Sequence, residues 1–518
     1  MQLSFFDGTT PFRIENPIRL IELFGGYGSQ ALALKYLGVS FEHWKMSEWA
    51  VKSIQAYKDL HAADDNKDYS EGLTEAEIKA WLLGRISSNY SEPLSEKQIE
   101  RLRESEVRKI YNNMRATQNL GSIMAISGEQ LEIVDTDSYC YIMTYSFPCQ
   151  DLSSAGKGAG MEKGSGTRSG LLWEVERILT ECENLPQVLL MENVPEVVGT
   201  KNMPQFAKWL AFLDGLGYKT RWQVLNTKDF GIPQNRARCF AVSVLGDYFY
   251  EHPKGYPLEI RLKDVLEKAV DEGYYLKEET IQSLNIHKQR PEGFKTAVLV
   301  VDEPIVYDGF NGQVRTDSST IGTITRNVGA DLKRNGQGII EPVIIEDFYK
   351  GRGNRYYDQE APTIRADRDG LKVAEPLSEY ELSETMKKYI NSYDDKYQVS
   401  DSKLVLNKKV ATPITTREGC SRADSSTYVS PNFPEEQNIA RMDVTPFRVR
   451  KLTERECFRL QGVKDTDFAK IRQNQSKSSC YHLAGDSITT SVLMALFGQM
   501  LGVDWRSKVD ELVKEIKK

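Results

Sequence analysis

The hydrophobic pattern near the start of the chain predicts a strand, a turn and a helix. An apolar run from Ile18 to Phe24 leads into the turn Gly25-Gly26-Tyr27-Gly28. Apolar residues then recur at helical spacing from Ser29 to Leu37, and Gly38 stands where helices often end on a glycine. A glycine turn between a strand and a helix is typical of folds that hold a nucleotide or an adenosyl group.

The same alternation continues along the chain and predicts an α/β fold. Val39 to Met46 is expected to form a second strand that ends near Glu48, roughly 20 residues after Gly28, where such folds place an acid for ribose hydroxyls. Further strands are predicted at Tyr139 to Tyr145, Val188 to Met191 and Ala237 to Val244. Strands that alternate with helices imply a mostly parallel sheet.

Two segments depart from this rhythm. From about 61 to 118 the chain carries charged helical patterns with two capping boxes, which begin at Thr74 and Ser95, and we interpret the segment as a helical insertion. Beyond about Tyr250 the helical pattern is lost, and the short segments 323–326, 362–365 and 413–417 resemble one another. This part predicts a second domain that contains β-structure.

Composition bounds the class of protein. The chain has 518 residues, of which 40% are hydrophobic, and a formal net charge of −7. No apolar run approaches the roughly 20 residues that cross a bilayer, and Met1 to Thr10 lacks the blocks of a signal peptide, so we expect a cytoplasmic protein without a membrane partner. The 7 cysteines form no CxxC pair, which indicates neither a disulfide framework nor a metal site. A local basic cleft for nucleic acid stays compatible with the acidic total.

The candidate chemistry centres on Cys149, which follows one predicted strand, and Glu192, which follows another. Carbon 5 of a cytosine attacks a sulfonium methyl only after a nucleophile has added at carbon 6, and a thiolate suits that addition. A carboxyl group whose pKa burial raises can protonate ring nitrogen 3. Alone, each residue has an ordinary interpretation, a buried hydrophobe or a surface acid. Together they predict a nucleophile and an acid, and Asn193 can orient neighbouring groups.

Two further features support a site at these strand ends. The segment from Asp151 to Gly170 is rich in glycine, which predicts a functional loop beside Cys149; the alternative is a plain flexible connection. Arg236 and Arg238 stand two apart at the start of a strand and therefore point to opposite faces. One can face the site while the other braces it, unless both are ordinary surface arginines.

On these residues the chain resembles the DNA (cytosine-5) methyltransferases of bacterial and phage type. The resemblance covers roughly residues 18 to 245 and 445 to 500. It is carried by Phe24 to Gly28, Pro148-Cys149-Gln150, Glu192-Asn193-Val194, Gln234 to Arg238, Arg450 to Gly462, and Gly485 to Ile488. It implies a Rossmann-like methyltransferase domain at 1–250 with the insertion at about 61–118, a smaller target-recognition domain at 251–440, and a return to the catalytic domain at 441–518.

The resemblance also implies the site residues and S-adenosylmethionine as cofactor. Catalytic roles fall on Cys149, Glu192, Asn193, Arg236 and Arg238. Cofactor contacts are expected from Phe24, Gly25, Gly26, Tyr27, Gly28, Glu48, Trp49, Ser122, Ile123, Pro148, Asp486 and Ser487, and DNA contacts from Gln150, Ser153 and Arg168. Two positions depart from the family: an acid is common where Gly121-Ser122-Ile123 falls, and an asparagine where Asp486 stands.

The implied reaction is methylation of cytosine carbon 5 within a specific double-stranded DNA sequence, by base flipping and a covalent adduct of Cys149 at carbon 6. Modification in a restriction system and self-protection of a phage are the two roles this implies. A companion restriction endonuclease is not physically required, and a monomer suffices for the chemistry. An RNA cytosine-5 methyltransferase would use the same thiolate, and a non-catalytic DNA-binding protein could keep the fold, so both alternatives stay open at this point.

Overall fold

The computed structural model describes residues 10–148, 152, 160–164, 167–277, 305–309, 311–315, 319–324, 336–342, 344–345, 356–357 and 447–517. The chain divides into two compact units. The first comprises Met1–Val265, Gly322–Arg326 and Glu454–Lys518, and the second comprises Leu266–Ile321 and Asn327–Thr453. The boundaries therefore lie later than the predicted 250 and 440.

Segment 322–326 returns to the first unit because polar groups of that unit bind it. The backbone N–H of Ile324 donates to Oε1 of Gln234, and its carbonyl accepts from Nη1 of Arg236. Of the three similar short segments, 362–365 and 413–417 lie outside the described residues.

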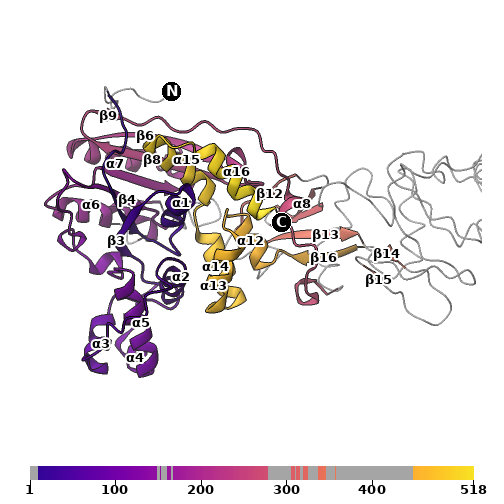
Figure 1. Ribbon diagram of the computed structural model, residues 1–518, viewed down its shortest axis with the longest axis horizontal. Coiled ribbons are helices and arrows are strands. Elements are labelled where there is room, and N and C mark those ends of the chain that lie inside the picture. Colours follow the sequence, from indigo (N-terminus) through magenta and orange to yellow (C-terminus); the bar gives the residue numbers. More distant parts are fainter. Residues whose placement is uncertain are drawn as a thin grey trace, which may run out of the picture. The chain divides into compact units, whose positions relative to one another are not determined.

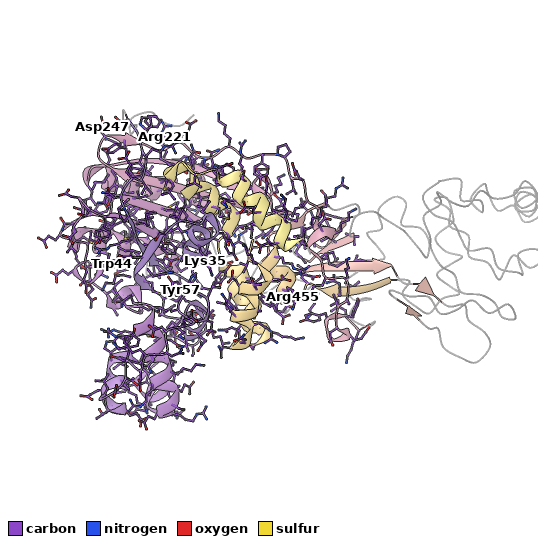
Figure 2. All side chains as sticks on the ribbon, viewed as in Figure 1. Lys35, Trp44, Tyr57, Arg221, Asp247 and Arg455 are labelled. Carbon is purple, nitrogen blue, oxygen red and sulfur yellow. The ribbon has the colours of Figure 1, made fainter. Side chains whose placement is uncertain are left out.

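The first unit is built on a six-stranded sheet in the order β3-β2-β4-β5-β8-β6. β3, β2, β4 and β5 run parallel, and β8 is antiparallel to both β5 and β6, so the sheet is mostly parallel as predicted. Every residue of β2, β4 and β5 is buried, as expected for central strands covered on both faces. The strands are β2 (Ile18–Leu23), β3 (Phe41–Ser47), β4 (Cys140–Tyr145), β5 (Val188–Asn193), β6 (Tyr218–Asn226) and β8 (Ala237–Leu245). Figure 2 shows Trp44 on the edge strand β3.

Helices cover both faces of this sheet (Figure 1). Side chains of α6 (Leu172–Glu181) and α7 (Met203–Gly215) pack with Ile21 and Leu23 of β2 in one hydrophobic core. Glu22 points to the opposite face, where its carboxylate accepts from Ala31 in α1 (Ser29–Leu37). α1 also packs on α15 (Thr490–Leu501) and α16 (Trp505–Ile516), so the carboxyl-terminal segment completes the fold.

The remaining elements of the first unit are short or connect these layers. They are β1 (Thr10–Pro11), α2 (Val51–His61), η2 (Ile123–Ala125), η3 (Glu129–Leu131), η4 (Arg168–Leu171), η5 (Pro195–Val198), η6 (Thr227–Phe230), β7 (Gln234–Asn235), β9 (Tyr248–Phe249), α8 (Leu262–Val265), α12 (Glu454–Arg459), α13 (Asp465–Gln473) and α14 (Lys477–Asp486). No helix in the described ranges is long and apolar enough to cross a membrane.

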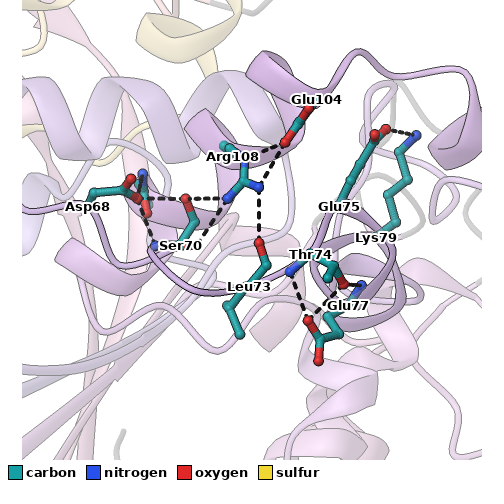
Figure 3. A network of polar contacts seen from close by, with 10 residues as sticks. Asp68, Ser70, Leu73, Thr74, Glu75, Glu77, Lys79, Glu104 and Arg108 are labelled. Atoms are coloured by element: carbon teal, nitrogen blue, oxygen red, sulfur yellow. Dashed lines mark hydrogen bonds and ion pairs between the residues drawn. The ribbon is translucent and has the colours of Figure 1, made fainter.

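The predicted insertion forms three helices next to α2, namely α3 (Glu75–Leu82), α4 (Glu96–Glu100) and α5 (Glu104–Ala116), around an apolar core of their own. Both predicted capping boxes are present. Figure 3 shows the first, at Thr74 and Glu77, and the guanidinium of Arg108, which binds the carbonyls of Ser70 and Leu73. Arg108 thereby fixes the loop before α3 onto α5.

The second unit contains a four-stranded antiparallel sheet in the order β11-β10-β13-β16 and a short antiparallel pair, β14 with β15. Its described content is therefore mainly β, as the sequence predicts for this region. Its elements are η7 (Glu272–Tyr274), β10 (Ile305–Asp308), β11 (Gln313–Arg315), β13 (Gln337–Pro342), β14 (Ile344–Ile345), β15 (Tyr356–Tyr357) and β16 (Phe447–Lys451). β12 (Ile321–Gly322) stands at the boundary between the two units.

Candidate active site

Three parallel strands end side by side and bring the predicted chemistry to one edge of the sheet. In the pairing register Leu23 lies beside Tyr145, and Tyr145 lies beside Met191. The next residues along each strand lead to the glycine turn, to Pro148 and to Glu192. Ligands of open α/β sheets bind at the carboxyl ends of the strands, so this edge is the candidate site.

The chain that leads into Cys149 is fixed at two successive carbonyls. Nδ2 of Asn193 donates to the carbonyl of Phe147 at 2.9 Å, and Oγ of Ser169 donates to the carbonyl of Pro148 at 2.8 Å. Asn193 also accepts from the backbone of Val194. Cys149, Gln150 and Ser153 lie outside the described residues. The two bonds attach the approach to Cys149 to β5 and to η4.

Glu192 is 8% exposed and pairs with Arg238 on the adjacent strand β8, where Nε of Arg238 lies 3.2 Å from Oε1 of Glu192. Burial raises the pKa of Glu192 above its ordinary value, and the charges of Arg238 and Arg236 oppose that rise. The raised pKa favours the protonated form of this carboxyl group, which is the direction that a proton donor needs.

Arg236 and Arg238 diverge as the alternation of a strand predicts. Arg236 is 4% exposed and donates to the carbonyls of Ile324, Gly485 and Ser487. It lies between β7 and β8 and connects the start of β8 to the carboxyl-terminal segment, while Arg238 faces Glu192.

The glycine turn adopts left-handed backbone conformations that favour glycine. The φ angles are 56° at Gly26 and 83° at Gly28, and Phe24 also has a positive φ of 58°. A Cβ atom at Gly28 would lie 2.4 Å from Nε2 of His61, whereas one at Gly26 would meet nothing within 4 Å. The side chain of Tyr27 is buried against Phe458, so only its backbone is left to contact a ligand.

Glu48 lies directly after β3 and is bound to the glycine turn. Its carboxylate accepts from the backbone N–H of Gly26 at 2.9 Å and from that of Ala50 at 2.7 Å. Desolvation raises its pKa to about 7, with a smaller contribution from the negative charge of Asp486. The charge of Asp486 thus affects the pKa of Glu48, the predicted ribose acid, although the two residues are far apart in sequence.

The predicted adenine edge, Ser122 and Ile123, is held by α6. Nη2 of Arg177 donates to the carbonyls of Ile123 and Ile126, at 3.1 and 2.9 Å. The carboxylate of Glu181 accepts from Gly128 at 2.9 Å. A Cβ atom at Gly128 would lie 2.3 Å from the carbonyl oxygen of Ile178, so only glycine permits this close approach.

The other predicted residues lie around this edge. Oγ of Ser487 donates to the carbonyl of Ala484, while Asp486 at the end of α14 is exposed. Trp49 is partly buried and follows Glu48. Arg168 begins η4, and its Nη1 reaches Oγ of Ser91 in the helical insertion at 3.4 Å.

Sequence reasoning missed three residues that position the site: Ser169, Arg177 and Asn119. Ser169 directly follows Arg168, and this adjacency was the one local signal available. Arg177 lies on the middle of a helix and looks like an ordinary surface arginine in the sequence. Asn119 precedes the glycine of the adenine-edge segment, but its bonds to Glu48 depend on folding.

The described residues fit an adenosyl cofactor. The backbone at Gly26 faces open space on the side where a Cβ atom would point, and the partly buried carboxylate of Glu48 lies beside it. A desolvated acid next to an open glycine turn is the arrangement that binds ribose hydroxyls in α/β folds.

Comparison with known proteins agrees with this geometry. A family profile, that of the C-5 cytosine-specific DNA methylases, matches residues 97–502. The orphan methyltransferase M.SssI of Spiroplasma monobiae is 35% identical over 62% of this chain and 86% of its own length. The type II methyltransferase M2.ScrFI of Lactococcus lactis subsp. cremoris is 36% identical over 50% of this chain and 70% of its own. The orphan methyltransferase M.SPRI of Bacillus phage SPR is 23% identical over 93% of this chain and 97% of its own. With its strand-end acid, its glycine turn and this match over most of its length, the chain belongs to the C-5 cytosine-specific DNA methylases, enzymes that transfer a methyl group to cytosine in DNA.

Proposed function

We propose that this methyltransferase modifies cytosine within a specific double-stranded DNA sequence, with Cys149 as the nucleophile and Glu192 as the acid. One observation carries the proposal: Asn193, the neighbour of Glu192, binds the carbonyl of Phe147 at 2.9 Å, so the acid and the approach to Cys149 are joined at adjacent strand ends.

The two residues divide the activation of the ring. The thiolate of Cys149 adds to carbon 6, and negative charge develops on the ring towards nitrogen 3. Protonated Glu192 donates to nitrogen 3 and relieves that charge, which is why a raised pKa matters here. After carbon 5 has been methylated, loss of its proton and departure of the thiolate restore the aromatic ring.

Two arginines support this chemistry in different ways. Arg238, already 3.2 Å from Glu192, is placed to donate to the carbonyl oxygen of the flipped cytosine. Arg236 instead holds the backbone at Gly485 and Ser487. Its loss would disturb the cofactor side of the site without removing a contact to the base.

S-adenosylmethionine supplies the electrophilic methyl group when it is bound. We assign its ribose to Glu48, its adenine to the neighbourhood of Phe24, Trp49 and Ser122–Ile123, and its methionine end to Asp486 and Ser487. The backbone of Gly26 and the carboxylate of Glu48 form the preformed part of this pocket.

Recognition of a DNA sequence requires more contact surface than the catalytic unit alone offers. Chemistry on a base inside a duplex requires that base to be flipped out, which costs a few kcal/mol and is offset by groove and phosphate contacts. We assign target recognition to the second unit and a DNA contact to Arg168. Exchange of the second unit for that of a relative should change the methylated sequence and leave the chemistry intact.

Similarity to type II and orphan methyltransferases supports a role in a restriction system or in protection of a phage genome. Such an enzyme works as a monomer in the cytoplasm, where its DNA substrate is. A cognate endonuclease would recognise the same DNA sequence without binding the methyltransferase. Sequencing of methylated DNA from a host that expresses the chain would identify that target.

Trapping of the covalent intermediate tests the mechanism. A duplex that contains 5-fluorocytosine should form an adduct stable to denaturation when cofactor is present, because fluorine cannot leave as a proton does. Cys149→Ser should abolish the adduct and leave cofactor affinity nearly unchanged. Cys182→Ser is the matched control, since Cys182 is a partly buried cysteine whose thiol donates to the carbonyl of Gly128. An adduct that survives Cys149→Ser would contradict the assignment of the nucleophile. Methylation of RNA in place of DNA would favour the alternative of an RNA cytosine-5 methyltransferase.

A further inference from the structure

We infer that Asn119, at the exit of the helical insertion, is a positioning residue that sets Glu48 for the cofactor ribose, and that the insertion acts as a brace for this acid. The inference rests on the proposed cofactor role of Glu48. Asn119 belongs to none of the sequence motifs that carry the family resemblance.

The side chain of Asn119 pairs with both backbone groups of Glu48. Its Nδ2 donates to the carbonyl of Glu48 at 2.9 Å, and its Oδ1 accepts from the N–H of Glu48 at 3.1 Å. Oδ1 also accepts from Gly121 at 2.9 Å. Asn119 is 3% exposed, so water does not replace these bonds easily. The amide therefore acts like one more residue of a β-ladder along Glu48.

The backbone around Asn119 reinforces this contact. Met46 and Asn119 form a parallel bridge, with Met46 donating to Gln118 and Leu120 donating to Met46. Oγ of Ser47 donates to the carbonyl of Gly121 at 2.7 Å. The segment thus extends the sheet beyond the edge strand β3 at the point where β3 ends.

The segment between α3 and α4 binds the backbone of the residues that follow Glu48. Ser87, between α3 and α4, donates to the carbonyl of Trp49 at 2.7 Å and accepts from Val51 at 3.0 Å. Arg85, two residues earlier, packs so closely on Gly121 that a Cβ atom there would lie 2.7 Å from the Cβ of Arg85. Glu48 and Trp49 are therefore bound on two sides by the insertion.

This arrangement explains why an insertion far from Cys149 in sequence bears on the cofactor. The carboxylate of Glu48 already accepts from Gly26 and Ala50, so its remaining lone pairs point in directions fixed by its backbone. A shift of that backbone would turn these lone pairs away from the ribose. Loss of the Asn119 amide should therefore weaken cofactor binding only in so far as Glu48 contributes to it.

A double-mutant cycle tests this, with calorimetric affinity for S-adenosylhomocysteine as the readout. The variants are Asn119→Ala, Glu48→Ala and the double variant, each in the full chain. Asn113→Ala is the matched control, because Asn113 is also a buried asparagine of the insertion and binds Gln55 instead of Glu48. We expect Asn119→Ala to weaken binding about 10-fold when Glu48 is present and less than about 2-fold in the Glu48→Ala background, as a bond of ordinary strength predicts. Asn113→Ala should leave affinity unchanged.

Equal losses in both backgrounds, no loss at all, or the same loss in Asn113→Ala would overturn the inference. Unchanged affinity in Glu48→Ala would instead remove the proposed ribose site, and the inference with it. If Asn119→Ala does not fold by circular dichroism, Asn119→Asp replaces it. This variant keeps the size and both acceptor bonds, and it sets a carboxylate oxygen in place of the N–H that donates to the carbonyl of Glu48, so the same cycle applies.

Discussion

Nε of Arg238 lies 3.2 Å from Oε1 of Glu192, across the antiparallel pair formed by β8 and β5. The pair places two opposing influences on one carboxyl group. Burial raises the pKa of Glu192, and the positive charges of Arg238 and Arg236 lower it, with burial the larger effect. The protonated form of Glu192 is thus favoured by burial, while its ionised form has a partner in Arg238.

The first prediction concerns the pH dependence of catalysis. Because the proposed mechanism uses protonated Glu192, the single-turnover rate should fall as pH rises past its pKa. Arg238→Met removes a charge that lowers this pKa, so the fall should move to higher pH. Glu192→Gln should show no such fall and should be slower by about 10² to 10⁴-fold. A fall at the same pH in all three proteins would assign it to another group.

The second prediction concerns the approach to Cys149. Asn193→Ala removes the bond to the carbonyl of Phe147, so the thiol should be less well placed and kcat should drop about 10-fold, with little change in KM for DNA. Asn202→Ala is the control, because its side chain donates to the carbonyl of Glu196 at the same 2.9 Å and so fixes a different segment. Equal effects of the two variants on kcat would show a general loss of stability.

The third prediction follows from the pKa of Glu48, which desolvation raises to about 7. In the proposed cofactor site the ionised carboxylate would accept hydrogen bonds from ribose hydroxyls and attract a sulfonium charge. Affinity for S-adenosylmethionine should therefore increase from pH 6 to pH 8, with a midpoint near pH 7. Titration calorimetry at several pH values measures this, and Glu48→Gln should flatten the profile. A wild-type affinity that does not vary over this range would contradict the prediction.

The fourth prediction concerns stability. Glu22 is 1% exposed, accepts from the hydroxyl of Tyr57 at 2.5 Å, and has a pKa raised by burial from 4.5 to about 7. Since the folded state binds this proton more tightly than the unfolded state, the free energy of unfolding should decrease as pH rises from about 4.5 to 7 and then level off. The slope from one such group is at most about 1.4 kcal/mol per pH unit.

Glu22→Gln should remove this contribution. Tryptophan fluorescence during urea unfolding is a suitable measurement, because all 7 tryptophans belong to the first unit. The slopes of the two stability profiles should differ most between pH 5 and pH 7, and above pH 7 the two profiles should run parallel. A variant with the same pH profile as the wild type would mean that Glu22 ionises normally.

Local patterns in the sequence were enough to predict several elements of the first unit. The helix Ser29–Leu37 has the predicted bounds, and Gly38 ends it in the left-handed conformation with φ of 74°. Both capping boxes, the mostly parallel sheet and the divergence of Arg236 and Arg238 are also confirmed. The helix ends, the capping boxes and the divergence of the two arginines depend on neighbours within one turn or one strand, and the parallel sheet follows from the alternation of strands and helices. The residue types at the strand ends indicated Cys149 and Glu192, and the spacing after the glycine turn indicated Glu48.

Only the tertiary structure decided how these residues are held. Asn119 meets Glu48, and Arg177 meets Ile123, across long stretches of sequence, and each bond exists because a strand edge or a helix face comes close after folding. The return of Ile324 to the first unit follows from Gln234 and Arg236 in the same way. Hydrogen bonds between distant segments leave no periodic trace in a sequence, because a single polar residue satisfies them. The sequence therefore predicted the groups to which we assign the chemistry, and packing determined which groups hold the described ones in position.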